Sequence, residues 1–155
     1  MNTLLNNKFF VIYLAPFLLG GATILSFPPY NFTFVNFFSF SFLLFLILVI
    51  KKKTQSKYRK KKSNRYFFYL GCAFGFGFFL FGNYWISISL THDEIFKGLI
   101  PFSLILVPLF LSLFFGLATF ITGSFIEKNI SFILMFSLVF SAFEYLRGNI
   151  LTGFP

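Results

Sequence analysis

The feature that most restricts the fold of this chain is a series of long apolar runs that contain almost no charge. A bilayer core about 30 Å thick is crossed by about 20 predominantly apolar residues in a helix. Four runs reach that length without a charged side chain, and a fifth contains one carboxylate, Glu144. The five runs are residues 9–27, 32–50, 66–88, 99–126 and 130–146.

These runs are continuous rather than alternating, which favours helices over strands. A helix also satisfies its own backbone hydrogen bonds in lipid, where no water is present to do so. We therefore expect an all-α integral membrane protein with about five transmembrane helices. All of residues 1–155 are expected to form one membrane-helix domain.

Proline and short polar segments separate the runs. Pro28 and Pro29 follow the first run, and proline both lacks a donor N–H and disfavours helical geometry in the residue before it. The short connections at residues 91–94 and 127–129 should make the neighbouring helices antiparallel. The run 99–126 is longer than a perpendicular span requires, so we expect a tilt, or a kink at Pro108.

The charged residues are few and unevenly placed. The chain is 57% hydrophobic and 11% charged, whereas soluble domains have about a quarter of their residues charged, so a soluble globular fold is excluded. Residues 51–65 hold seven lysines, two arginines and no acid, which equals the whole net charge of +9. A nucleic-acid-binding surface needs cations spread over a folded face, so no nucleic-acid partner is expected.

The same basic residues predict the orientation in the membrane. Lys8, the segment 51–65 and Lys128 fall on one side, and Lys97 and Arg147 fall on the other. Loops rich in lysine and arginine stay in the cytoplasm. We therefore expect a cytoplasmic N-terminus, a cytoplasmic basic loop at 51–65 that also meets anionic lipid, and a C-terminal end outside after five crossings.

Glu144 has two interpretations of equal weight. Intramembrane carboxylates tend to be paired and functional. However, Arg147 lies three residues later on the same helical face, so the two side chains also fit an ordinary ion pair with Arg147 reaching to the interface. Trp85, the single tryptophan, is typical of an interfacial anchor.

The other residues with reactive side chains do not assemble into a site. Cys72 is the single cysteine and lies inside an apolar run, where we expect a small buried side chain. His92 is the single histidine, in a short loop beside Asp93 and Glu94. No catalytic set, metal site or cofactor is expected.

The third run carries several glycines: Gly71, Gly75, Gly77 and Gly82. Small residues four apart let helix backbones approach closely in lipid, which predicts that this helix is central in a bundle. The alternative is that a lipid acyl chain lies against the glycines. The sequence does not separate these two interpretations.

Several of these features, in this order, resemble the apolipoprotein N-acyltransferase family. The most specific part is the end of the chain, where Glu144, Leu146 and Arg147 are followed by a short spacer and Thr152-Gly153-Phe154-Pro155. Weaker similarity covers the end of the first run, with Ser26-Phe27-Pro28-Pro29-Tyr30, and the glycine-aromatic third run ending in Asn83-Tyr84-Trp85.

The resemblance implies an enzyme of the bacterial inner membrane that transfers a phospholipid acyl chain to the N-terminal cysteine amine of a diacylated lipoprotein. In that family a periplasmic nitrilase-like domain with a Glu-Lys-Cys triad carries the chemistry through a thioester. That domain is expected to lie outside these residues, so this chain would be an inactive fragment on its own.

The resemblance also assigns candidate roles at the periplasmic face. Structural or lipid-contacting residues there are Trp85, Glu144, Arg147, Thr152, Gly153, Phe154 and Pro155. No residue of this chain is expected to be catalytic. Two other classes stay open: a small multispanning transporter subunit, which Glu144 would serve, and a non-catalytic membrane scaffold.

Overall fold

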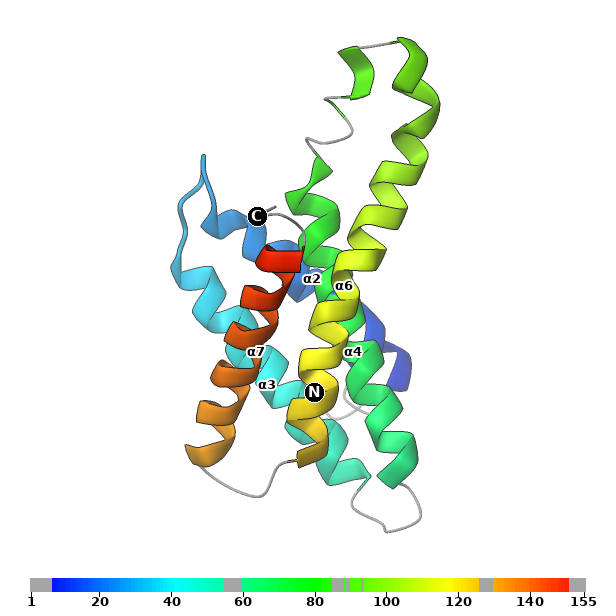
Figure 1. The fold of residues 1–155 in the computed structure, drawn as a ribbon. Helices are drawn as coiled ribbons and strands as arrows, with labels where there is room; N and C mark the ends of the chain where they lie inside the picture. The colour runs from blue at the N-terminus through cyan, green and yellow to red at the C-terminus, as the bar shows by residue number, and fades with distance from the viewer. Residues whose placement is uncertain are drawn as a thin grey trace.

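A computed structural model describes residues 7–54, 60–84, 88, 90–92, 94–125 and 130–150, and every regular element within them is a helix (Figure 1). In chain order they are η1 (Phe10–Leu14, a π-helix), α2 (Ala15–Ala22), η2 (Thr23–Ser26, a 3-10 helix), α3 (Phe34–Lys53), α4 (Lys60–Gly82), η4 (Leu90–His92), η5 (Glu94–Leu99), α6 (Ile100–Phe125) and α7 (Ile130–Ile150). In this part of the chain four helices are long and apolar enough to cross a membrane, and the apolar helix Phe10–Ser26 is shorter. The all-α membrane fold expected from the sequence is confirmed.

The first helical segment changes character along its length. η1 is a π-helix placed directly before α2, and Pro16 near the start of α2 has no N–H to donate to the carbonyl four residues back. η2 ends the segment at Ser26, just before the prolines that were expected to stop it. Pro28–Pro29 is a cis peptide bond, and Asn31, a residue type that tolerates the left-handed region, has φ 56°.

The helices around the basic segment are longer than the apolar runs that predicted them. α3 continues to Lys53 and α4 already begins at Lys60, so the loop expected over residues 51–65 is mostly helical in its described part. Lysine and arginine are good helix formers, and the cations in the last turn of α3 interact favourably with the helix dipole. The change in charge therefore marks the end of the apolar region and not the end of a helix.

At their other ends α4 stops at Gly82, earlier than the expected 88, and α7 continues to Ile150, beyond the expected 146. α6 stays one helix through Pro108. In Figure 1 successive long helices run in opposite directions, as expected from the short connections. The turn after η2 and the ends of α4 and α7 lie at one end of the bundle, and the end of α3 and the starts of α4 and α7 lie at the other.

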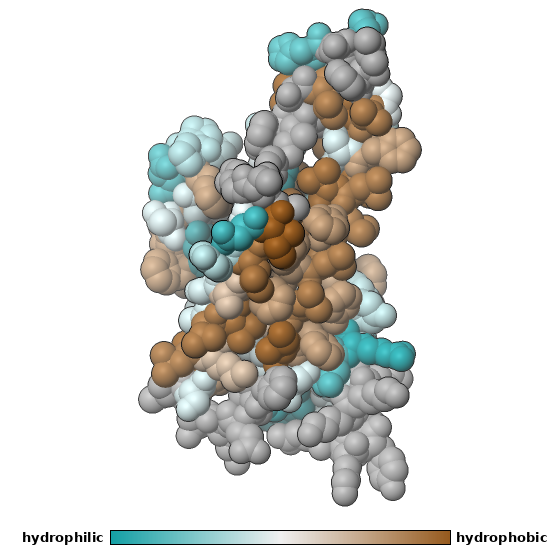
Figure 2. All heavy atoms as spheres, in the orientation of Figure 1, coloured by the Kyte–Doolittle hydropathy of each residue, from teal (hydrophilic) through white to brown (hydrophobic). Residues whose placement is uncertain are grey.

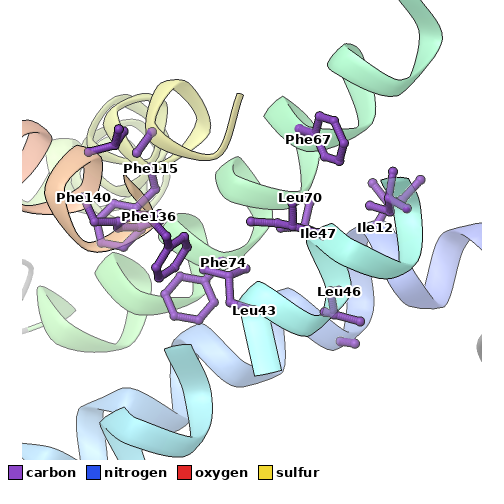
Figure 3. Packing of buried hydrophobic residues seen from close by; sticks show 14 of the residues in the cluster. Ile12, Leu43, Leu46, Ile47, Phe67, Leu70, Phe74, Phe115, Phe136 and Phe140 are labelled. Carbon is purple, nitrogen blue, oxygen red and sulfur yellow. The ribbon is translucent and has the colours of Figure 1, made fainter. Parts of the chain in front are cut away.

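α4 is the central helix, with its largest contacts to α6 and α2. Phe74 of α4 stacks on Phe115 of α6, with ring centroids 5.8 Å apart, and Phe115 meets Phe140 of α7 edge to face at 5.4 Å. Phe40 of α3 lies 5.4 Å from Phe74. Figure 3 shows Phe115, Phe136 and Phe140 gathered next to Phe74. A single aromatic core therefore joins α3, α4, α6 and α7.

Neighbouring helices pack directly against the glycines of α4. A Cβ on Gly71 would lie 2.4 Å from the Phe115 carbonyl oxygen of α6, and one on Gly77 would lie 2.2 Å from the Phe17 carbonyl oxygen of α2. Between these helices the Thr119 hydroxyl donates to the Phe67 carbonyl at 2.8 Å. Because helix backbones fill these positions, the packing interpretation of the glycines is confirmed and no room is left there for an acyl chain.

Candidate functional site

The Glu144–Arg147 pair predicted from spacing is formed on α7. Arg147 Nη2 donates to Glu144 Oε2 at 2.8 Å and Arg147 Nε donates to the same oxygen at 3.2 Å. The Arg147 side chain is 9% exposed and that of Glu144 is 40% exposed. The guanidinium is thus the buried member of the pair, whereas the carboxylate is partly open to the surroundings.

Arg147 also contacts α4. Its guanidinium carbon lies 5.4 Å from the ring centroid of Phe79, within the range of a cation–π interaction. Phe79 is 1% exposed and meets Phe115 of α6 edge to face at 5.5 Å. One cation therefore connects the end of α7 to α4 and, through Phe79, to α6.

Sequence reasoning missed Phe79, because nothing distinguishes it from the other 29 phenylalanines before the packing is known. Asn83 was quoted only as part of a motif. Its backbone N–H donates to the Phe79 carbonyl at 2.9 Å, so Asn83 lies one turn beyond Phe79, directly after the end of α4. The Asn83 Nδ2 atom is buried and has no hydrogen-bond partner among the described residues.

The remaining predicted site residues cannot be placed against this pair. Trp85, Thr152, Gly153, Phe154 and Pro155 lie outside the described residues. The structure therefore brings together Glu144 and Arg147 of the predicted set, and adds Phe79 through its contact with Arg147.

The connection between α4 and α6 holds a second group of charged and titratable side chains. His92 is exposed in η4, and Glu94 forms an ion pair with Lys97 in η5. Asp93 lies outside the described residues. Among the residues described, no group of three or more histidine, cysteine, aspartate or glutamate side chains could hold a metal ion.

Cys72 lies within α4, in the bundle and away from this end. Its sulfur lies against α6, because a Cβ on Gly116 would be 2.4 Å from it. In the described part of the chain the pair therefore stands without a nucleophile beside it. What the pair can do chemically is hold the end of α7 against α4 and present one partly exposed carboxylate.

The sequence matches known proteins over most of its length. The family model for the apolipoprotein N-acyltransferase N-terminal domain matches residues 19–155. An apolipoprotein N-acyltransferase of Brucella melitensis is 33% identical over 92% of this chain, and one of Rhizobium etli is 32% identical over 88%. One of Rickettsia typhi is 42% identical over 55%.

The match covers a limited part of those relatives. The chain spans 26% of the Brucella melitensis protein, 25% of the Rhizobium etli protein and 17% of the Rickettsia typhi protein. No solved structure matches it. Glu144, Arg147, Phe79 and Asn83 all lie inside the region that the family model matches.

Proposed function

The chain belongs to the apolipoprotein N-acyltransferase family, and we propose that it is the membrane-embedded part of an enzyme that acylates lipoproteins. The donor would be a phospholipid and the acceptor the N-terminal cysteine amine of a diacylated lipoprotein. The observation that carries this proposal is the match of the family's N-terminal domain to residues 19–155. The helical membrane fold is consistent with it.

The proposed location is the inner membrane of a bacterium, with several crossings. The relatives are bacterial proteins and the described chain has four helices able to span a bilayer. The basic end of α3 would face the cytoplasm, because cations are retained on that side. The end that carries Glu144 and Arg147 would then face the periplasm, where the family's nitrilase-like domain is expected.

We propose that Glu144 and Arg147 brace the periplasmic ends of α7 and α4. The burial of Arg147 over Phe79 supports bracing more than direct contact of the guanidinium with a lipid headgroup. Trp85 and the stretch 152–155 are proposed to complete this end of the membrane region, next to the lipid from which the acyl chain comes.

The transporter and scaffold interpretations are not favoured. The transporter interpretation depended on Glu144 as an intramembrane carboxylate, and that carboxylate accepts two hydrogen bonds from Arg147. Nothing in the described helices supplies a second, independent reason for a transport path.

The test is acylation by the complete reading frame that contains this chain. Expressed in a bacterium depleted of its own apolipoprotein N-acyltransferase, it should restore growth and convert diacylated lipoprotein to the triacylated form, measured by mass spectrometry of the lipoprotein N-terminus. Residues 1–155 expressed alone should reach the membrane and give no conversion. Absence of triacylated product from a membrane-inserted complete chain would overturn the proposal.

A further inference from the structure

A groove of about 440 Å³ opens between the first helical segment, α4 and α6. This volume is in the range of about 300–1,000 Å³ typical of small-molecule sites. Its lining consists of apolar and aromatic side chains with one cysteine and one serine: Phe9, Tyr13, Leu14, Phe17, Tyr69, Cys72, Ala73, Phe76, Leu109 and Ser112.

The serine hydroxyl of the lining is already engaged within α6. Ser112 Oγ donates to the Leu109 carbonyl at 2.7 Å. A polar ligand group would therefore find little to bind inside the groove. An apolar chain fits this lining, because it loses no hydrogen bonds on entering.

The groove is open to its surroundings along one side. Tyr13, Tyr69 and Leu109 are each between 42% and 50% exposed although they line it. All three contributing helical segments are apolar enough to lie in a membrane. In a bilayer the medium at this opening is lipid, so an acyl chain can enter from the side without crossing a polar layer.

The lining residues of the groove that come from α4 lie on the same helix face as a basic residue. Tyr69, Cys72, Ala73 and Phe76 follow the i, i+3, i+4, i+7 pattern of one helix face, and Arg65 lies one turn before Tyr69 on that face. Arg65 is exposed. The α4 side of the groove therefore ends in a positive charge.

In the first helical segment, too, a basic residue lies next to the lining of the groove. Lys8 is exposed and directly precedes Phe9, a lining residue. The ring of Tyr13 lies 5.8 Å from Phe9 and 6.2 Å from Tyr69 of α4, so the two segments meet at this end of the groove. Lys8 and Arg65 therefore flank one end of an apolar groove.

We propose that this groove holds one acyl chain of an anionic phospholipid whose headgroup phosphate lies between Lys8 and Arg65. Cations near a membrane surface attract the headgroups of anionic lipids. Figure 2 shows hydrophilic atoms along the lower border of the hydrophobic band, toward the end where α4 begins. The occupant is thus a complete lipid: the apolar lining binds its acyl chain, and the two cations bind its phosphate.

This lipid is distinct from the acyl donor proposed above. Arg65 and Phe79 are about 21 Å apart along α4 at 1.5 Å per residue, so the groove's charged end is remote from the Glu144–Arg147 pair. The inference requires the bilayer but not the acyltransferase activity.

The test uses the complete chain in phosphatidylcholine vesicles that contain trace phosphatidylglycerol or trace phosphatidylcholine, each with a photoactivatable diazirine on one acyl chain. Cross-linked residues are mapped by mass spectrometry. We expect labelling at residues 9–17 and 69–76, about fivefold or more higher with phosphatidylglycerol. The double variant Lys8→Gln, Arg65→Gln should bring that labelling down to the phosphatidylcholine level.

Two further variants distinguish the effect of the cations from the effect of the room available in the groove. Lys52→Gln, Lys53→Gln removes the same charge from the end of α3, which contributes no lining residue, and should leave the labelling unchanged. Ala73→Leu narrows the groove and should lower labelling by both lipids. Equal labelling by the two lipids, labelling that survives the Lys8, Arg65 double variant, or no labelling of the lining with either lipid would each overturn the proposal.

Discussion

Arg147 is a charged side chain that is buried in the folded chain. It is 8% exposed as a residue, between the Glu144 carboxylate and the Phe79 ring. Burying a cation is costly unless it is paired and hydrogen bonded. The Glu144 carboxylate of α7 supplies charge-assisted hydrogen bonds, and the Phe79 ring of α4 supplies a favourable quadrupole. Groups from both helices therefore offset the cost of burying the Arg147 charge.

Glu144→Gln tests this compensation. Glutamine keeps the shape and an acceptor but removes the charge, so the buried guanidinium loses the two charge-assisted hydrogen bonds to Glu144. We expect a loss of about 1–3 kcal/mol in the free energy of unfolding, together with reduced lipoprotein acylation by the complete chain. Unfolding in detergent followed by circular dichroism measures the first, and the product assay measures the second.

The matched control is Glu94→Gln. Glu94 and Lys97 are also three residues apart and paired, but their side chains are 88% and 50% exposed. Exposed ion pairs contribute between 0 and about 1 kcal/mol, so this variant should be close to wild type. If Glu144→Gln left both protein level and activity at the wild-type value, the bracing role would be abandoned.

At the scale of helices, α4 owes its central place to glycine on two faces. Gly71 and Gly75 contact α6, and Gly77 contacts α2. Without a hydrophobic driving force between helices in lipid, close van der Waals contact and interhelical hydrogen bonds such as that of Thr119 must hold them together. The spacing of these glycines predicted a packing role, but not which helix each would meet.

Gly71→Ala measures what this contact contributes. A Cβ there would lie 2.4 Å from the Phe115 carbonyl oxygen and even closer to the Thr119 hydroxyl, so α4 and α6 must separate. We expect the variant to unfold in detergent at lower denaturant, with a loss of about 1–3 kcal/mol.

Gly148→Ala on α7 is the control for helix propensity, because nothing lies within 4 Å of its Cβ position. It should be neutral or more stable by up to about 1 kcal/mol, since alanine favours helix over glycine. Equal effects of the two substitutions would contradict the close-packing explanation.

At the scale of the whole molecule, the two ends of the bundle differ in chemistry. The end of α3, which carries three lysines, lies at one end of the bundle, and the end of α7, which carries the Glu144–Arg147 pair, lies at the other (Figure 1). Retention of cations in the cytoplasm predicts that the basic end stays inside.

Cysteine accessibility tests this orientation. In a version of the chain whose single cysteine, Cys72, is replaced by alanine, Tyr30→Cys marks the turn after η2 and Lys52→Cys marks the end of α3; both positions are exposed. In intact spheroplasts a membrane-impermeant maleimide should label Tyr30→Cys, and should label Lys52→Cys only after lysis. The reverse pattern would contradict the predicted topology.

Much of the fold followed from the sequence. Long uncharged runs predicted the helices and their alternating directions, because apolar length in a bilayer leaves few other structures. Helix ends were less certain: α3 and α4 extend into the basic segment and α4 stops at Gly82. Charge reports the border of the hydrocarbon, and it does not stop a helix.

The candidate site followed only in part. Spacing alone gave the Glu144–Arg147 pair, because residues three apart on a helix are neighbours. The contact of Phe79 with Arg147 could not be predicted from the sequence. Phenylalanine occupies both the buried and the lipid-facing positions of α4, so nothing in the sequence singles out position 79. The groove between Tyr13 and Tyr69 was likewise invisible, because it forms only where three helices meet.

By itself the sequence determined a helical membrane protein of this family, since run length, cation placement and the motif at residues 144–155 are one-dimensional properties. Only the tertiary structure decided which aromatic ring covers Arg147, which helix fills each glycine and where an apolar groove meets two cations. The physical reason is that helix faces toward protein and toward lipid are both apolar here. The pattern along the chain therefore does not record which face has a neighbour, and packing alone supplies that information.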